Sequence, residues 1–198
     1  MKPIFVGIAG GTGAGKSTLS RAIKSKYPNV VEIIQLDNYF KTSDTIPKLA
    51  GFDNWDHPDA LNFDRLISDL KAFSKGKSAT TYVKNELVTP GVYETQEKKQ
   101  IEIFPKPLMI VEGYLMLYRP EVRELLSKKI FLDIPHDLRW KRRIHFKIND
   151  YEKNVVIPMY KEFVEPTKQF ADFVLDVTNM TPNEVYQSVE PLFLEYVI

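Results

Sequence analysis

Residues 10–18 read Gly10-Gly11-Thr12-Gly13-Ala14-Gly15-Lys16-Ser17-Thr18 and match the pattern G-x-x-x-x-G-K-[ST]. The apolar run at residues 4–9 is typical of a buried parallel strand, and residues 17–23 are compatible with the first turns of a helix. A glycine-rich loop between a strand and a helix offers backbone N–H groups and the partial positive charge of the helix N-terminus to an anion. The stretch therefore predicts a phosphate-binding loop, in which Lys16 reaches the β- and γ-phosphates of a nucleotide and Ser17 offers its hydroxyl to Mg²⁺.

The composition of the chain limits the class of protein and of partner. A length of 198 residues with 43% hydrophobic residues is enough for one core, so one main domain is expected. The 27 basic and 26 acidic residues nearly balance, so the chain lacks the strongly basic field of a dedicated nucleic-acid binder. We therefore expect a small molecule as the partner.

The absence of cysteine and of long apolar runs indicates a compartment. Without cysteine the chain has no disulfide, no thiolate nucleophile and no cysteine-ligated zinc, which fits a reducing environment. No apolar run approaches the roughly 18 residues of a membrane-spanning helix. The expectation is a cytoplasmic protein without a membrane or nucleic-acid partner.

Two acidic residues follow expected strands. The run at residues 30–36 reads as a second strand and ends at Asp37, and the strongly apolar run at 107–111 leads to Glu112. Ligands of open α/β sheets bind at the carboxyl ends of the strands, so both acids are expected to face the phosphate loop. Glu112 is placed like the acid that acts on Mg²⁺ in phosphate-loop enzymes. The alternatives are that Asp37 only caps the next turn and that Glu112 is a surface residue.

Residues 41–62 lose hydrophobic periodicity and are rich in turn-forming residues, with Trp55-Asp56-His57-Pro58-Asp59-Ala60 near the end. A long loop without regular structure in a compact domain is usually functional. The alternative is structural, because Asp59 or Asn62 could cap the following helix. His57 has no second His or Cys at ligand spacing, which argues against a metal role.

The remaining chain alternates helices and strands. Two β-type runs at 79–83 and 100–104 flank a polar stretch, which predicts an inserted β-hairpin at about 78–105. Helices are expected at 63–73, 156–170 and 183–196, and strands at 129–133 and 173–177. The fold class that follows is α/β, a P-loop NTPase-type parallel sheet flanked by helices, as a single domain over residues 1–198.

A basic helix is expected at 136–147, directly after a strand. It carries Arg139, Arg142 and Arg143, which helical spacing spreads over several faces. An arginine in a lid over transferring phosphates is this kind of residue, and a solvated charged surface is the alternative. Residues 139–153 are therefore expected to form a short lid.

Further motifs follow the phosphate loop in order along the chain. They are Leu36-Asp37-Asn38-Tyr39-Phe40, Asp56-His57-Pro58-Asp59-Ala60, Val111-Glu112-Gly113-Tyr114-Leu115, Arg142-Arg143 and EPTKQFAD at residues 165–172. Together, over nearly the whole chain, they resemble the phosphoribulokinase/uridine kinase family of P-loop kinases. The resemblance implies a β-hairpin over a nucleoside site. It also implies transfer of the γ-phosphoryl of ATP to the 5′-hydroxyl of a ribonucleoside, foremost uridine or cytidine.

The same resemblance assigns roles to individual residues. It makes Asp37 the catalytic base, with Ser17, Glu112 and Asp37 around Mg²⁺. It makes Asp56 and Arg143 the residues that hold the ribose hydroxyls. ATP and Mg²⁺ are the implied cofactors, and a homo-oligomer, a dimer or a tetramer, is compatible with the resemblance.

The expected hairpin departs from the family. Family members carry Tyr-Asp-Phe-x-x-His-x-Arg there to contact the base, and the histidines of this chain are at positions 57, 136 and 145, outside the hairpin. We expect Tyr39 and His57 beside the acceptor, and Tyr82, Lys84 or Tyr93 in place of the missing motif. The identity of the base stays open.

Two alternatives follow from the other departures. The basic lid is short, and Ile157-Pro158-Met159-Tyr160 resembles the Trp-Pro-Met-Tyr of nicotinamide riboside kinases, which offer a second acceptor class. A non-catalytic nucleotide-binding regulatory module is the alternative from a different functional class. A GTPase is disfavoured, because neither Asn-Lys-x-Asp nor Asp-x-x-Gly occurs in the chain.

Overall fold

The computed structural model describes residues 2–84, 98–142 and 149–197, and its centre is a five-stranded sheet with the order β2-β7-β1-β8-β9. The strands are β1 (Ile4–Ala9), β2 (Val31–Gln35), β7 (Leu108–Glu112), β8 (Lys128–Asp133) and β9 (Phe173–Asp176). Every neighbouring pair is parallel, which confirms the expected α/β class. β7 is buried along its whole length, because helices cover both faces of the sheet, and its sequence is accordingly a continuous apolar run.

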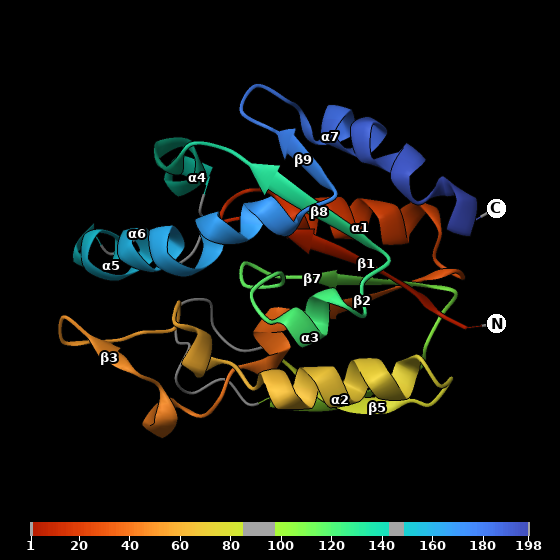
Figure 1. Cartoon of the computed structure of the whole chain (residues 1–198), viewed down its shortest axis with the longest axis horizontal. Coiled ribbons are helices and arrows are strands. Elements are labelled where there is room, and N and C mark those ends of the chain that lie inside the picture. Colours follow the sequence, from red (N-terminus) through yellow and green to blue (C-terminus); the bar gives the residue numbers. More distant parts are fainter. Residues whose placement is uncertain (1, 85–97, 143–148, 198) are drawn as a thin grey trace.

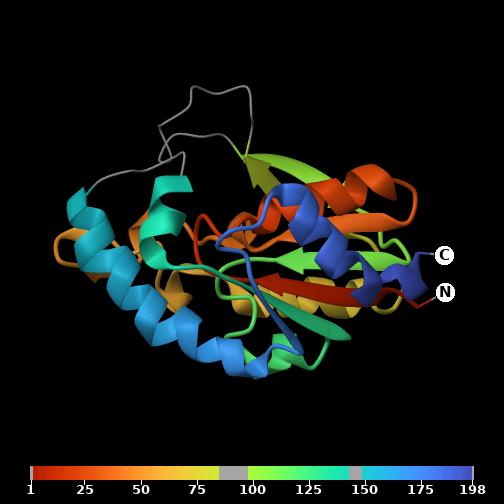
Figure 2. The same ribbon diagram turned by 90° about the horizontal axis from the view of Figure 1, so that it is seen from above.

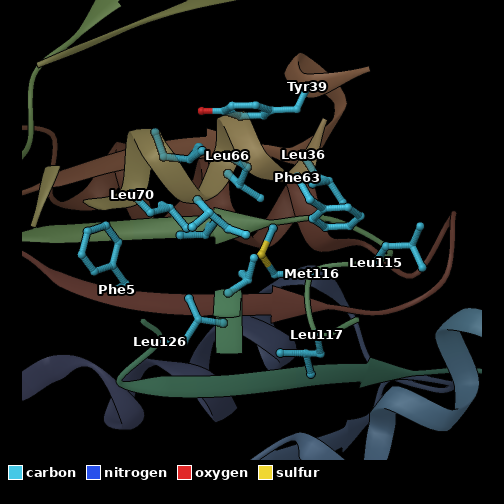
Figure 3. Close-up of a cluster of buried hydrophobic side chains, with 14 of the residues drawn as sticks. Phe5, Leu36, Tyr39, Phe63, Leu66, Leu70, Leu115, Met116, Leu117 and Leu126 are labelled. Atoms are coloured by element: carbon cyan, nitrogen blue, oxygen red, sulfur yellow. The ribbon is translucent and has the colours of Figure 1, made fainter. Parts of the chain in front are cut away.

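Helices form a layer on each face of the sheet (Figure 1). One face carries α1 (Lys16–Lys26) and α7 (Pro182–Val189), and the other carries α2 (Phe63–Phe73) and α3 (Pro120–Arg123). Successive residues of β1 point to opposite faces of the sheet: Phe5 packs on the α2 side and Val6 packs on the α1 side. Figure 3 shows the α2 side, where Leu66 and Leu70 lie against the sheet.

The start of α2 is fixed by a side-chain cap. The Oδ1 atom of Asn62 accepts a hydrogen bond from the N–H of Arg65 at 3.0 Å, so Asn62, and not Asp59, is the capping residue. Directly before it, η3 (Pro58–Ala60) is a short turn in which Nδ1 of His57 accepts from the N–H of Asp59 at 3.0 Å. These local bonds orient the chain on both sides of the turn.

The inserted hairpin consists of β5 (Ala79–Lys84) and β6 (Lys98–Ile103), which pair antiparallel beside α2 (Figure 1). These strands confirm the expected hairpin, whose connection at 85–97 lies outside the described residues. A second hairpin was not expected, so the expectation of a loop without regular structure at 41–62 is wrong. This second hairpin consists of β3 (Lys48–Leu49) and β4 (Phe52–Asp53) and follows η2 (Ser43–Thr45).

The segment predicted to form a lid overlaps α4 (His136–Arg142) and the start of a helical stretch at 149–170, here called the lid-side helix. It runs through α5 (Asn149–Tyr151), η4 (Glu152–Val156), α6 (Ile157–Met159), η5 (Tyr160–Val164) and η6 (Glu165–Phe170). The helix expected at 156–170 thus begins earlier, at residue 149. Figures 1 and 2 both show α4, α5 and α6 on the side where the strand arrows end.

The C-terminal segment and the helix lengths complete the fold. The helix expected at 183–196 ends as an α-helix at Val189, because Pro191 follows, and continues as η7 (Glu190–Leu192) and η8 (Leu194–Tyr196). None of the helices in the described ranges combines the length and apolar character needed to cross a bilayer.

Candidate active site

The register of the central strands brings together Ser17 and Glu112, as expected from the sequence. Glu112 ends β7 opposite Gln35 on one side and Ile8 on the other, and only 3% of it is exposed. Its Oε2 accepts a hydrogen bond from Oγ of Ser17 at 3.0 Å, and its Oε1 accepts one from Nε2 of Gln35 at 3.0 Å. The carboxylate is thereby held in one orientation beside the first turn of α1.

Lys16 lies between the phosphate loop and the acids. Its Nζ donates to the backbone carbonyl of Gly11 at 3.1 Å. Burial lowers the pKa of Lys16, while the nearby charges of Glu112 and Asp37 act in the opposite direction and that of Arg139 adds to the lowering. A buried ammonium group beside two carboxylates suits a site that receives an anion.

Asp37 reaches this edge through η1 (Leu36–Tyr39), the short turn that follows β2. Leu36 is fully buried and touches the chain directly after β7, where a Cβ on Gly113 would lie 2.3 Å from Cβ of Leu36. Exposed Asp37 and buried Glu112 thus stand at the ends of two neighbouring strands, at the same edge of the sheet. The charge of Asp37 raises the pKa of both Lys16, in the phosphate loop, and Tyr114, in the cleft described next.

A small cleft opens between the phosphate loop and the lid-side helix. Its lining residues are Gly11, Thr12, Asp56, Tyr114, Arg139, Val156, Met159, Tyr160 and Val164. Asp56 accepts a hydrogen bond through Oδ2 from the hydroxyl of Tyr151 at 2.9 Å. The hydroxyl of Tyr114 donates to the carbonyl of Trp55 at 2.7 Å, and burial raises the pKa of Tyr114 well above its usual value, with Asp56 and Asp37 adding to the effect. Tyr114 therefore stays a neutral donor that fixes the backbone next to Asp56.

Arg139 is the cation that closes the cleft against the phosphate loop. It is 2% exposed, and its Nε donates to the carbonyl of Ile134 at 3.1 Å. Its guanidinium carbon lies 3.7 Å from the ring centroid of Tyr160. Within the described part of the chain, the buried Nη1 atom of Arg139 has no hydrogen-bond partner. A buried, unpaired N–H group is costly, so this atom is a candidate contact for a ligand anion.

Three expected site residues are not among those that line this cleft. Tyr39 is buried at the edge of the α2 core (Figure 3), and its hydroxyl donates to Oδ2 of Asp69 at 2.9 Å. Tyr82 stacks on the guanidinium of Arg65, with 4.8 Å from its carbon to the ring centroid. His57 caps the η3 turn, as described above. The structure thus places Tyr39 and Tyr82 in packing contacts and His57 in a turn.

Three further residues were predicted to belong to the site, and the structure describes only Arg142 among them. Arg142 donates through Nη2 to the carbonyl of Thr178 at 3.1 Å, so its guanidinium is directed to the loop after β9. Arg143 and Tyr93 lie outside the described residues. Sequence reasoning missed Tyr151 and did not give Tyr160 a site role, although the Ile-Pro-Met-Tyr stretch at 157–160 was a signal for the latter.

The donor set fits magnesium better than a metal held by protein alone. In the described ranges there is no cluster of three or more His, Cys, Asp or Glu side chains that could hold a metal ion. Mg²⁺ typically keeps several waters and binds through one or two carboxylates and substrate phosphates. One hydroxyl and one oriented carboxylate, Ser17 and Glu112, match that pattern.

Comparison with known proteins gives concordant matches. The model of the "Phosphoribulokinase / Uridine kinase family" matches residues 5–183. A uridine kinase of Clostridium botulinum (strain Okra / Type B1) is 34% identical over 190 residues, with 88% of each chain covered. A uridine kinase of Chlamydia pneumoniae is 33% identical over 213 residues, with 96% of this chain and 92% of the relative covered.

Solved structures share the fold. A possible uridine kinase from Bacillus stearothermophilus aligns with a TM-score of 0.60 at 20% identity, covering 89% of this chain and 90% of that one. Phosphoribulokinase from Rhodobacter spheroides aligns with a TM-score of 0.62 at 13% identity, covering 91% and 74%. They confirm the P-loop kinase type of sheet, and the matches over residues 5–183 confirm the resemblance seen in the motifs. The chain belongs to the phosphoribulokinase/uridine kinase family.

Proposed function

We propose that this protein is an ATP-dependent nucleoside kinase, which transfers the γ-phosphoryl of ATP to the 5′-hydroxyl of a ribonucleoside. The observation that carries the proposal is the convergence of Lys16, the Ser17–Glu112 pair and Asp37 at one edge of the sheet. Relatives named uridine kinase support uridine or cytidine as the acceptor. The cytoplasmic location and the homo-oligomer remain predictions.

The phosphate side of the site binds ATP through the loop at residues 10–18 and the N-terminus of α1. Among the described residues no side chain caps α1, so its first N–H groups are available to phosphate oxygens. Lys16 and Arg139 add positive charge at the transferring group. Ser17 and Glu112 would hold Mg²⁺ together with the phosphates, and the ion would neutralise negative charge on the transferring group.

The acceptor side of the site uses Asp37, which is exposed, and Asp56, which is half-buried. Asp37 accepts the proton of the 5′-hydroxyl as that oxygen attacks the γ-phosphorus. Asp56, oriented by Tyr151, accepts hydrogen bonds from the ribose hydroxyls. The role of Arg143 at the ribose stays a prediction from the family resemblance.

Base discrimination is expected to be weak. Strong rejection of analogues comes from hydrogen bonds that a wrong base leaves unpaired, and the hairpin histidine that could make such a bond is absent from this chain. Tyr82, the described candidate for its replacement, stacks on Arg65. We expect the ribose, rather than the base, to dominate recognition.

The test is product formation from ATP and a panel of acceptors: the ribonucleosides, 2′-deoxyuridine and nicotinamide riboside. We expect 5′-monophosphates from uridine and cytidine, with kcat/KM values of the ribonucleosides within about 100-fold of each other. A preference for uridine over every other nucleoside by several orders of magnitude would show that another residue reads the base. ATP hydrolysis that no acceptor stimulates would overturn the kinase proposal.

Nicotinamide riboside is included because a specific observation favours it as the second candidate. Met159 and Tyr160, the last two residues of the Ile-Pro-Met-Tyr stretch, line the cleft. If this acceptor is preferred over uridine by more than about 100-fold, the alternative acceptor class replaces the pyrimidine nucleosides.

Replacing Glu112 tests the magnesium assignment. Glu112→Gln keeps the shape of the side chain but removes the charge, so the apparent Mg²⁺ affinity should fall about 10-fold or more. Excess Mg²⁺ should restore much of kcat in a magnesium titration of the rate. Glu121→Gln, at an exposed ion pair with Arg119 on α3, is the matched control and should titrate like the wild type. A loss of kcat that magnesium leaves unchanged would contradict the role of Glu112.

A further inference from the structure

Tyr160 and Arg139 form a contact that the proposed reaction leaves unexplained. Tyr160 is the first residue of η5, and its ring packs against the guanidinium of Arg139 at 3.7 Å. Both residues line the cleft together with Gly11. A Cβ on Gly11 would lie 1.9 Å from Nη1 of Arg139 and 2.9 Å from Cε2 of Tyr160. The three residues are therefore packed with no space for one more carbon atom.

Two contacts hold the guanidinium of Arg139 and leave its Nη1 atom without a partner among the described residues. Nε is used by the carbonyl of Ile134, and one side of the guanidinium is covered by the Tyr160 ring. Nη1 has no partner in the described part of the chain and lies against the phosphate loop at Gly11. An arginine side chain has many rotamers, and a neighbouring aromatic face restricts them. The ring of Tyr160 thus keeps the guanidinium at the loop.

The chemistry of Tyr160 agrees with a packing role. Burial raises the pKa of Tyr160, so its phenol is neutral at physiological pH and gives no counter-charge to Arg139. The attraction is then that of a cation for an aromatic face, which is strong when both groups are removed from water. Burial also lowers the pKa of Arg139, yet a guanidinium stays charged in proteins.

We propose that Tyr160 is a positioning residue for the phosphate donor: its ring holds Arg139 against the phosphate loop so that Nη1 meets a phosphate oxygen of ATP. The inference rests on the proposed contact of Arg139 with the phosphates. It adds that this contact depends on the lid-side helix, because Tyr160 of that helix holds Arg139 in place. Tyr160 itself makes no contact with the reacting atoms.

The experiment compares Tyr160→Leu with Tyr160→Phe, which keeps the ring. ATP binding is measured by titration calorimetry without acceptor, and KM for ATP and kcat are measured with uridine. We expect Tyr160→Leu to weaken ATP binding about 10-fold, and Tyr160→Phe to stay within about twofold of the wild type. If Tyr160→Leu does not fold, as judged by thermal melting, Tyr160→Met takes its place.

A matched control exists at the far end of the same helix. The guanidinium carbon of Arg123 lies 3.9 Å from the ring centroid of Phe170, away from the cleft. Phe170→Leu removes a stack of the same kind and should leave ATP binding and KM unchanged. A loss of ATP affinity equal to that of Tyr160→Leu would mean that any damage to the helix weakens binding, which overturns the proposal.

A double-mutant cycle separates positioning from general damage. Arg139→Met should weaken ATP binding more than Tyr160→Leu does, and adding Tyr160→Leu to Arg139→Met should cost less than a further twofold. Additive losses would overturn the proposal.

The outcomes also separate this inference from the proposed function. If wild type phosphorylates nucleosides but Tyr160→Leu binds ATP normally, only this inference fails. If no acceptor is phosphorylated but the cycle shows coupling, the proposed acceptor fails and the role of Tyr160 stands.

Discussion

Lys16→Ala is expected to lower kcat by about 1,000-fold or more while the protein still folds. The Nζ atom of Lys16 lies in the phosphate loop, bonded to the carbonyl of Gly11 and close to the charges of Glu112 and Asp37. In the proposed reaction this ammonium adds positive charge at the transferring phosphoryl, so alanine should remove stabilisation that the transition state needs.

The effect of Lys16→Ala on stability should be small. A buried ammonium loses its hydration, which offsets what it gains from the two acids, so the free energy of unfolding should change by about 1 kcal/mol or less. The measurements are kcat under saturating ATP and uridine, and thermal melting by circular dichroism. Lys24→Ala, on the same helix as Lys16, is the control: it breaks an ion pair with Glu32 of β2 and should keep full activity. Turnover by Lys16→Ala within a factor of ten of wild type would contradict the role of the lysine.

Asp37→Asn should lower kcat by about 100- to 10,000-fold with nearly unchanged ATP binding. Asparagine is almost isosteric with aspartate but cannot accept a proton from the attacking hydroxyl. The buried anchors of η1 are Leu36 and Tyr39, and exposed Asp37 contributes little packing, so the turn should be preserved. The measurement is single-turnover product formation together with ATP titration.

Magnesium distinguishes Asp37 from Glu112. Excess Mg²⁺ should rescue Glu112→Gln in part and leave Asp37→Asn unchanged. Asp44→Asn, at an exposed position in η2, is the control for the loss of one negative charge. Rescue of Asp37→Asn but not of Glu112→Gln would show that the two roles are exchanged.

The sheet and the residues at its edge were predictable because their signals are local. The apolar runs that became β1 and β7 and the glycine-rich loop between β1 and α1 each occupy a few consecutive residues. Parallel strands then bring their carboxyl ends together, so the approach of Ser17 to Glu112 follows from the fold class alone.

The small β3–β4 hairpin was missed because its turn carries a weak signal. Ala50 and Gly51 both have positive φ, 50° and 82°, which is the geometry of a tight two-residue hairpin turn. Such turns usually show Asn-Gly or Asp-Gly, and alanine rarely adopts this conformation. The strands are also only two residues long, too short for an alternating pattern.

Contacts between distant segments account for the other differences. Tyr39 belongs to a motif shared with the family, but which way its ring turns depends on Asp69 of α2. Asp56 is paired with Tyr151, and Arg139 is paired with Tyr160. Both tyrosines come from the lid-side helix, and no sequence pattern near them indicates these pairings.

The packing of Arg139 also limits which sequences can fill the phosphate loop. In the pattern G-x-x-x-x-G-K-[ST], positions 11 and 13 accept any residue, yet here a Cβ on Gly13 would lie 2.2 Å from the carbonyl oxygen of Arg139, and one on Gly11 would overlap its guanidinium. Gly13 has a φ of +79° as well. A related chain with a larger side chain at position 11 must therefore place its lid arginine differently. The residues at positions 11, 13 and 139 together should therefore distinguish family members by where this arginine lies. The loop pattern alone does not make that distinction.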